Sequence, residues 1–105
     1  MTPSARDASA AGAPLGRSAA EELARTLRAV ADPTRLQLLS VILDSDSGRA
    51  TVRQLTEALQ LRQPTVTHHV RILVDDGLLR REPEGKYVWL SLEPSRRAAV
   101  EDLLR

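Results

Sequence analysis

The stretch from residue 63 to residue 73 reads QPTVTHHVRIL and carries side chains that could bind nucleic acid. Its spacing predicts an amphipathic helix that turns Val66, His69, Val70 and Leu73 toward a core. The opposite face carries amide, hydroxyl, imidazole and guanidinium groups, which can hydrogen-bond to base edges or phosphate oxygens in the major groove. These residues are Gln63, Thr65, Thr67, His68 and Arg71. A helix exposed only to water would look similar, so the flanking sequence has to distinguish the two possibilities.

The composition is that of one small soluble globular domain, with 42% hydrophobic and 28% charged residues in a chain of 105. A net charge of +1 does not by itself indicate nucleic acid, so a prediction of DNA binding depends on where the charges lie. Lys86 is the only lysine. The remaining cations are arginines, which are the better bidentate partners for guanine and phosphate.

The chain has no cysteine, which excludes disulfides, thiolate metal sites and thiol redox sensing. No apolar run approaches the ~20 residues that span a bilayer. The N-terminus also lacks the basic start and apolar segment of a secretory signal. The sequence therefore predicts a cytoplasmic protein with no membrane association.

Two helices are predicted before the first loop. Residues 1–17 are rich in Ala, Ser, Pro and Gly and are predicted to be a flexible tail, followed by one domain over residues 18–105. Ser18 and Glu21 have the spacing of a capping box, which predicts a helix to about Ala31 with Leu23, Leu27, Val30 and Ala31 on one stripe. Asp32 and Pro33 are typical of the start of a second helix. Its predicted buried residues are Leu36, Leu39, Ile42 and Leu43.

The central residues predict a helix-turn-helix. Thr51 and Gln54 form a capping box that opens a short helix to about Leu59, whose predicted inward residues are Val52, Leu55, Ala58 and Leu59. A turn over residues 60–62 separates this helix from the one at residue 63, and a second helix so joined is the one that enters the major groove. That helix is predicted to end at Asp76, with Gly77 and Leu78 completing a Schellman motif.

Residues 78–82 and 87–92 are predicted strands, and residues 83–86 are a predicted turn, so the three make a hairpin. Alternation in the second strand predicts that Val88, Leu90 and Leu92 face the core and that Tyr87, Trp89 and Ser91 face outward. Pro94 then opens a last helix that carries Ala98, Val100, Leu103 and Leu104. The predicted fold is mainly α with a small β-hairpin wing (α+β), a winged helix-turn-helix in the order ααααββα.

Four motifs in this order resemble those of ArsR/SmtB-type winged-helix transcriptional regulators. Residues 27–36, LRAVADPTRL, are similar to the ALADPTRL opening of that family, and residues 63–70, QPTVTHHV, are similar to its QPTVSHHL recognition helix. DGLL at 76–79 and GKYV at 85–88 resemble the strand and wing motifs that follow. The resemblance covers about residues 20–105 with order and spacing kept.

The resemblance implies a homodimer that binds double-stranded DNA at an inverted-repeat operator and represses transcription. It implies that the first and last helices form the dimer interface, through Leu23, Leu27, Val30, Val100, Leu103 and Leu104. The alternative is that both stripes pack within one subunit. The predicted DNA contacts are Arg62, Gln63, Thr65, Thr67, His68 and Arg71, with Lys86 and either Arg80 or Arg81 from the wing, Arg81 being preferred.

The chain departs from the family pattern at Arg62, where many members have a serine that caps the recognition helix. Arginine cannot cap in this way, and a lost cap costs ~1 kcal/mol. Two possibilities follow: Gln63 caps the helix instead, or the cap is replaced by a contact between Arg62 and a DNA phosphate.

The metal sites of the family have no counterpart in this sequence. One type uses cysteine in the first helix of the helix-turn-helix, where residues 51–55 offer no thiolate; another uses histidine and carboxylate pairs on the last helix, where only Glu101 and Asp102 are present. Carboxylates alone do not select zinc. His68 and His69 are adjacent on a helix, about 100° apart, and cannot converge on one ion. We therefore expect no transition-metal site and no cofactor, with His68 facing DNA and His69 facing the interior.

Two other classes of function, a protein-interaction module and an enzyme, fit the sequence less well than DNA binding. A winged helix used as a protein-interaction module without a specific DNA site is compatible with the near-neutral charge. Between residues 51 and 92 there are six cations and five anions, but none of the anions falls between residues 63 and 71, which favours DNA. An enzyme is disfavoured because the chain has no cysteine nucleophile, no phosphate-binding glycine loop and no Ser/His/acid set that the fold would bring together.

Overall fold

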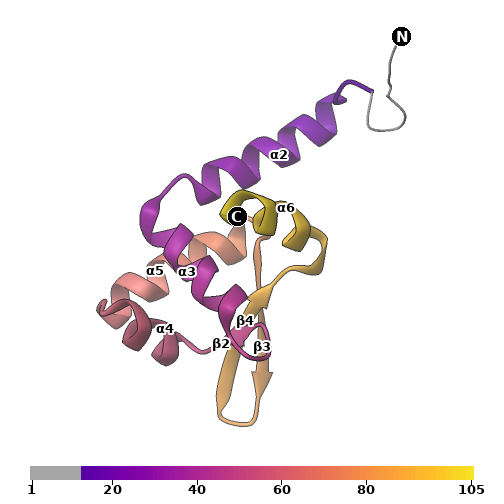
Figure 1. Cartoon of the computed structure of the whole chain (residues 1–105). Helices are drawn as coiled ribbons and strands as arrows, with labels where there is room; N and C mark the ends of the chain where they lie inside the picture. The colour runs from indigo at the N-terminus through magenta and orange to yellow at the C-terminus, as the bar shows by residue number, and fades with distance from the viewer. Residues whose placement is uncertain (1–12) are drawn as a thin grey trace.

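The computed structural model describes residues 13–105 (Figure 1), so most of the predicted N-terminal tail lies outside the described residues. Within that range the chain forms five helices and a three-stranded antiparallel sheet. The elements are α2 (Arg17–Val30), α3 (Pro33–Asp44), β2 (Arg49–Ala50), α4 (Val52–Leu59), α5 (Gln63–Asp75), β3 (Leu79–Glu84), β4 (Tyr87–Leu92) and α6 (Pro94–Leu104). The predicted winged helix-turn-helix is confirmed, with the short strand β2 added to the predicted order.

The core is built from aliphatic side chains between the helices and one face of the sheet. Its largest fully buried members are Leu38, Leu39, Ile42, Leu55, Val66, Leu73, Leu78, Leu90 and Val100. Two segments extend away from this body, α2 at one end and the β3–β4 hairpin at the other (Figure 1). Burying one such side chain stabilises the fold by about 1.5–3 kcal/mol, so this small cluster carries most of the stability of the domain.

The buried face of α3 differs from the prediction. Leu39 and Ile42 are buried as expected, but Leu36 and Leu43 are half-buried and Leu38 is fully buried in their place. This helix is apolar on most of its circumference, so its sequence does not define a single buried stripe. Ala58 of α4, predicted to face inward, is also exposed, and Leu55 is the only residue of that short helix that is fully buried.

The start of α2 is the clearest local correction. The helix begins at Arg17 with Gly16 as N-cap, and no side-chain hydrogen bond caps it. The predicted capping box of Ser18 and Glu21 is therefore wrong. Ser18 lies inside the first turn, and Glu21 instead forms an ion pair with Arg17, with Nε and Oε2 3.2 Å apart. Glycine is an acceptable N-cap residue because its extended backbone can initiate the helix without a side chain.

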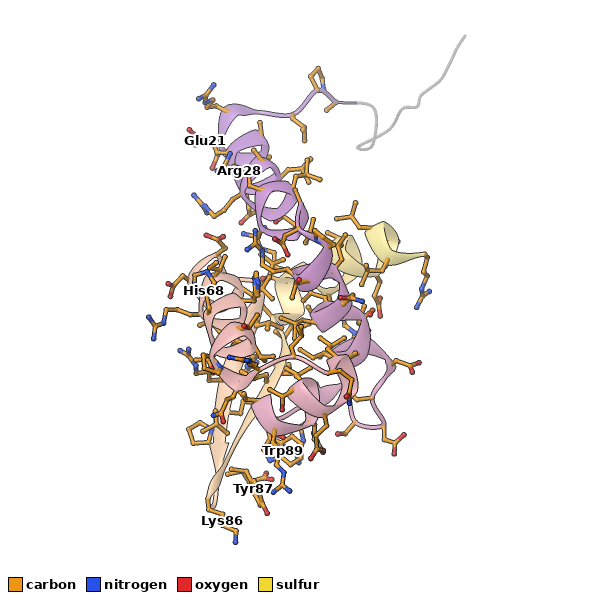
Figure 2. All side chains as sticks on the ribbon, turned by 90° about the vertical axis from the view of Figure 1, so that its left-hand side faces the viewer. Glu21, Arg28, His68, Lys86, Tyr87 and Trp89 are labelled. Carbon is orange, nitrogen blue, oxygen red and sulfur yellow. The ribbon has the colours of Figure 1, made fainter. Side chains whose placement is uncertain are left out.

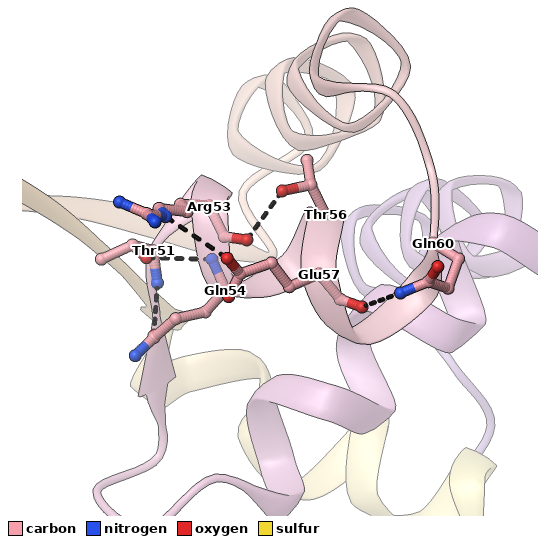
Figure 3. Close-up of polar contacts among 6 residues, drawn as sticks. All are labelled: Thr51, Arg53, Gln54, Thr56, Glu57 and Gln60. Atoms are coloured by element: carbon pink, nitrogen blue, oxygen red, sulfur yellow. Dashed lines mark hydrogen bonds and ion pairs between the residues drawn. The ribbon is translucent and has the colours of Figure 1, made fainter.

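Two other predicted caps are confirmed. The Asp32 carboxylate accepts a hydrogen bond from the backbone N–H of Arg35 at 3.0 Å. This hydrogen bond lowers the pKa of the Asp32 carboxyl below its usual value, against the opposing effect of desolvation. In α4 the Thr51 hydroxyl accepts from the backbone of Gln54 at 3.2 Å, and the Gln54 side chain accepts from the backbone of Thr51 at 3.0 Å (Figure 3).

The C-terminal end of α5 is the predicted Schellman motif. The backbone N–H of Leu78 donates to the carbonyl of Leu73 at 2.9 Å, and that of Gly77 donates to Val74 at 3.0 Å. Gly77 has a φ of 78°, in the left-handed region that favours glycine. The chain thereby turns directly from α5 into the wing.

The sheet order is β2-β4-β3, so β4 is central and β3 is an edge strand. Glu84 pairs with Tyr87, which leaves only Gly85 and Lys86 in the hairpin loop. The predicted four-residue turn is therefore two residues too long, and Pro83 lies in β3, where an edge strand tolerates its missing N–H. Leu90 and Leu92 face the core as predicted, but Val88 is 44% exposed because the hairpin extends beyond the helices that form the core.

Among residues 13–105 we find no helix that combines the length and the apolar character needed to cross a membrane.

Candidate nucleic-acid interface

The turn between α4 and α5 sets the direction of α5. Gln60 has a φ of 56° and is the one residue other than glycine with a positive φ among residues 13–105. Its side-chain amide donates to the carbonyl of Glu57 at 2.9 Å, which holds the turn against the backbone of α4 (Figure 3). The backbone N–H of Leu61 also donates back, to Thr56 at 3.3 Å. A left-handed non-glycine residue costs roughly 1–3 kcal/mol, which these hydrogen bonds offset.

The outer face of α5 presents the predicted polar side chains. A shallow hollow on it is lined by Gln63, Pro64, Thr67, His68 and Arg71. Gln63, His68 and Arg71 are exposed and Thr67 is half-buried. Thr65 is also exposed but is not part of this hollow. The structure thus brings four of the five predicted residues of this face to one concave surface that contains no acidic side chain.

The two histidines differ in their surroundings. His68 is exposed on the outer face of α5 (Figure 2). His69 is half-buried, and its Nδ1 lies 3.4 Å from Nη1 of Arg35 at the start of α3. The two rings are edge-to-face, with centroids 5.4 Å apart, and do not converge.

Arg62 occupies the N-cap position of α5 and makes no side-chain capping hydrogen bond. Pro64 at the second helical position has no N–H, which reduces by one the number of amides that a cap would have to satisfy. The exposed guanidinium of Arg62 is therefore not engaged in holding its own helix and extends the positive end of α5 into solvent.

The strand register separates the two arginines of the wing. Arg80 lies opposite Ser91 and its Nη2 is 3.5 Å from the Glu82 carboxylate, on the face away from the core. Arg81 lies opposite Leu90, so it is on the face that α5 packs against. Within the described part of the chain Arg81 has no ion-pair partner. Lys86 is exposed in the hairpin loop, with its ammonium 5.8 Å from the centroid of the Tyr87 ring.

A cluster at the base of the wing was not predicted. The guanidinium of Arg49 lies over the Trp89 ring, 4.1 Å from its centroid, and its Nη2 pairs with Glu84 at 3.2 Å. Trp89 Nε1 is buried and has no hydrogen-bond partner among the described residues. The cluster ties the hairpin to β2, a strand of only two residues that no periodicity could predict.

The six residues predicted for a dimer interface fall into two groups. Leu23, Leu27 and Leu103 are 41–46% exposed, and Leu104 is half-buried. Val30 and Val100 are instead buried within their own subunit, and Ala31 ends the α2 stripe as an exposed C-cap residue. These two valines therefore have little surface to offer a partner subunit. Their burial agrees with the alternative prediction, in which the apolar stripes of the first and last helices pack within one subunit.

Candidate metal ligands do not gather anywhere between residues 13 and 105: no three His, Cys, Asp or Glu side chains lie close enough to hold an ion. Glu101, one of the two adjacent carboxylates on the last helix, forms an ion pair with Arg97, with Oε2 and Nε 3.3 Å apart.

The geometry of α4, the turn, α5 and the hairpin defines a winged helix-turn-helix domain. A family model described as "Bacterial regulatory protein, arsR family" matches residues 32–81. The HTH-type transcriptional regulator NmtR of Mycobacterium tuberculosis is 34% identical over 90 residues, which are 86% of this chain and 72% of that protein. The chain belongs to the ArsR family of DNA-binding transcriptional regulators, and the prediction that it is not an enzyme is confirmed.

Two further comparisons agree with this assignment. The arsenical resistance operon repressor of Staphylococcus aureus is 29% identical over 85 residues, covering 81% of this chain and 76% of that protein. The structure of HlyU from Vibrio cholerae matches with a TM-score of 0.74 and 28% identity, covering 85% of this chain and 94% of that one.

Proposed function

We propose that this regulator is a homodimeric repressor that inserts the outer face of α5 into the major groove at each half of an inverted-repeat operator. The observation that carries the proposal is the exposed hollow formed by Gln63, Thr67, His68 and Arg71, which has hydrogen-bonding groups and no acidic side chain. Similarity to a protein described as an operon repressor supports repression as the outcome of binding.

The side chains divide into base and phosphate contacts by their chemistry. Arg71 can make two hydrogen bonds to guanine, and Gln63 can make two to adenine. His68, Thr65 and Thr67 supply further contacts to base edges or to the backbone. Arg62, Arg81 and Lys86 lie outside the hollow, and they position the protein on phosphates, with Lys86 reaching from the loop of the wing.

The dimer is proposed from the apolar side chains that one subunit leaves uncovered. Leu23 and Leu27 of α2 are exposed, whereas Val30 of the same stripe is buried, and Leu103 and Leu104 of α6 add to the apolar surface. A two-fold dimer would cover the same patch on both copies. Its two α5 helices would then read half-sites about one helical turn apart, roughly 10 base pairs.

The proposal includes no transition-metal effector, since the residues that hold metals in the family are replaced by residues that do not select them. Sub-micromolar binding of zinc or nickel in isothermal titration would contradict this part.

A gel shift on the DNA upstream of the protein's own gene tests the function directly. We expect a discrete complex that an unrelated duplex does not compete away, and a DNase footprint that covers two half-sites. The salt dependence of the affinity should fall when Arg62 is changed to Ser, with a slope smaller by about 1, because one phosphate contact is lost. Binding that is equal for all sequences would instead favour the alternative, a winged helix that interacts with proteins and has no specific site.

A further inference from the structure

Arg35 joins three segments that meet at the start of α3. Its side-chain Nε donates to the carbonyl oxygen of Ala29, in the last turn of α2, at 2.6 Å. Its Nη1 lies 3.4 Å from Nδ1 of His69, on the inner face of α5. One half-buried side chain therefore contacts both the C-terminal end of α2 and the helix that faces DNA.

The position of this side chain is fixed by its own backbone. The N–H of Arg35 is the donor in the Asp32 cap, so the residue is held at the first turn of α3. Guanidinium donors point in fixed directions from one plane, which allows Arg35 to reach two acceptors on different helices at once. A lysine would bring a single ammonium to the same place and could not span both acceptors in this way.

The direction of this contact follows from the chemistry of arginine. A guanidinium has donors and no acceptor, so Nδ1 of His69 is the acceptor for Nη1 of Arg35. The ring of His68 lies beside that of His69 in an edge-to-face arrangement, and the His68 side chain is exposed on the outer face of α5. The side chain of His69 is thus adjacent to His68, one of the residues proposed to contact DNA.

We propose that Arg35 is a positioning residue for DNA recognition. Through its contact with His69 it fixes the position of α5 relative to the end of α2, and it makes no DNA contact itself. The inference rests on the proposed function, in which α2 belongs to the dimer interface and the two α5 helices must present their outer faces to two half-sites together. Loss of the contact leaves phosphate attraction intact but misplaces the side chains that read bases.

Operator binding by Arg35→Gln, His69→Leu and the double variant tests the proposal. We expect each single change to weaken operator affinity about tenfold, within the usual range for coupling through a packed contact. The double variant should be no weaker than the weaker single variant, because both changes remove the same contact. Affinity for an unrelated duplex should stay within twofold. His69→Asn keeps an acceptor near the Nδ1 position and should restore most of the operator affinity.

Arg96→Gln is the matched control. Arg96 also anchors α2, by donating to the Thr26 hydroxyl and, at 3.4 Å, to the carbonyl of Glu22, but it is not hydrogen-bonded to α5. All variants are compared at a concentration where sedimentation gives the same oligomeric state, with melting temperatures measured alongside. The positioning role requires that Arg96→Gln keep the ratio of operator to unrelated-duplex affinity.

The outcomes separate this inference from the function on which it rests. If the wild-type protein binds no operator, the proposed function fails. If wild type binds and His69→Leu binds equally well, or if the effects of Arg35→Gln and His69→Leu simply add, only the positioning role is refuted. The His69 variants leave the Asp32 cap and α2 untouched, so they decide the question even if Arg35→Gln does not fold.

Discussion

Arg71 and Arg62 are both exposed on or beside α5, but their positions give them different partners. Arg71 lies in the hollow among Gln63, Thr67 and His68, where base edges would enter. Arg62 precedes the first turn and is free of any capping role. Guanidinium chemistry is the same at both sites, so the surroundings decide which one carries sequence information.

Arg71→Ala is expected to reduce operator affinity by about 1–3 kcal/mol and to relax the sequence preference at one base pair, because a base contact is removed. Fluorescence anisotropy with the operator and with single-base variants of it measures both effects. Arg25→Ala is the control, since Arg25 is exposed on α2, away from the hollow. If the operator affinity of Arg71→Ala stays within twofold of wild type at physiological salt, Arg71 makes no base contact and the prediction is wrong.

Asp32 gives a pH dependence of stability whose sign follows from its lowered pKa. The backbone hydrogen bond from Arg35 lowers the folded-state pKa of this carboxyl. The charged cap is therefore fully effective above the unfolded-state pKa of about 3.9 and is lost as the pH falls through the folded-state value. Asp32→Ala should cost about 1 kcal/mol in the free energy of unfolding at pH 7.

Urea titrations of the wild type and two Asp32 variants at several pH values provide the measurement. The wild type should lose its advantage over Asp32→Ala below about pH 4. Asp32→Asn, whose amide caps without ionising, should show no such loss. If the difference in the free energy of unfolding between wild type and Asp32→Ala stayed constant down to pH 2, the result would be inconsistent with an ionised cap.

At the scale of an element, the wing shows why two adjacent arginines are not equivalent. Strand register places Arg80 beside Glu82, away from the core, and Arg81 on the side of α5. Neutralising Arg81 should reduce the salt slope of operator binding by about 1, while Arg80→Gln should leave it unchanged. Affinities measured between about 50 and 200 mM salt distinguish the two variants; equal slopes for both would mean that the wing does not approach the DNA on the α5 side.

Local signals in the sequence predicted several helix ends correctly. The caps at Asp32 and Thr51 and the Schellman motif at Gly77 each depend on residues no more than five positions apart. The predicted cap at Ser18 was wrong because α2 begins at Arg17, with Gly16 as its N-cap residue. Periodicity failed at α3, where apolar residues occupy most of the circumference and the packed neighbours decide which leucine is fully buried.

The candidate site was also predictable where it depends on residues that are close together in the sequence. The outer face of α5 follows from helical spacing alone, and its predicted residues are exposed or half-buried. The contact between Arg35 and His69 spans 34 positions, and the pairing of β2 with β4 spans about 40, so neither leaves a periodic trace. Such contacts depend on how helices and strands pack, which a single sequence does not encode at any fixed spacing.

For the molecule as a whole, α2 extends away from the body of the domain (Figure 1). Part of its apolar surface, at Leu23 and Leu27, is exposed. Leu23→Glu together with Leu27→Glu should convert the proposed dimer into a monomer, because charges would be buried at the two-fold interface. Sedimentation velocity measures this, and operator affinity should fall because two half-sites can no longer be bound together.

Leu15→Glu is the control for that double variant. Leu15 is 62% exposed and precedes α2, so its change should alter neither mass nor affinity. A double variant that sediments like the wild type would place the interface elsewhere on the subunit.

The stacking of Arg49 over Trp89 gives the protein a built-in optical probe. Trp89 is the only tryptophan of the chain, and it lies where the hairpin joins β2. Its emission therefore reports on one place, the base of the wing, without labelling or mutation. Separation of Arg49 from Glu84 or entry of water to the indole N–H would change the intensity or wavelength of that emission. Titrating DNA into the protein and following tryptophan fluorescence would thus show whether the wing moves when its loop meets the duplex.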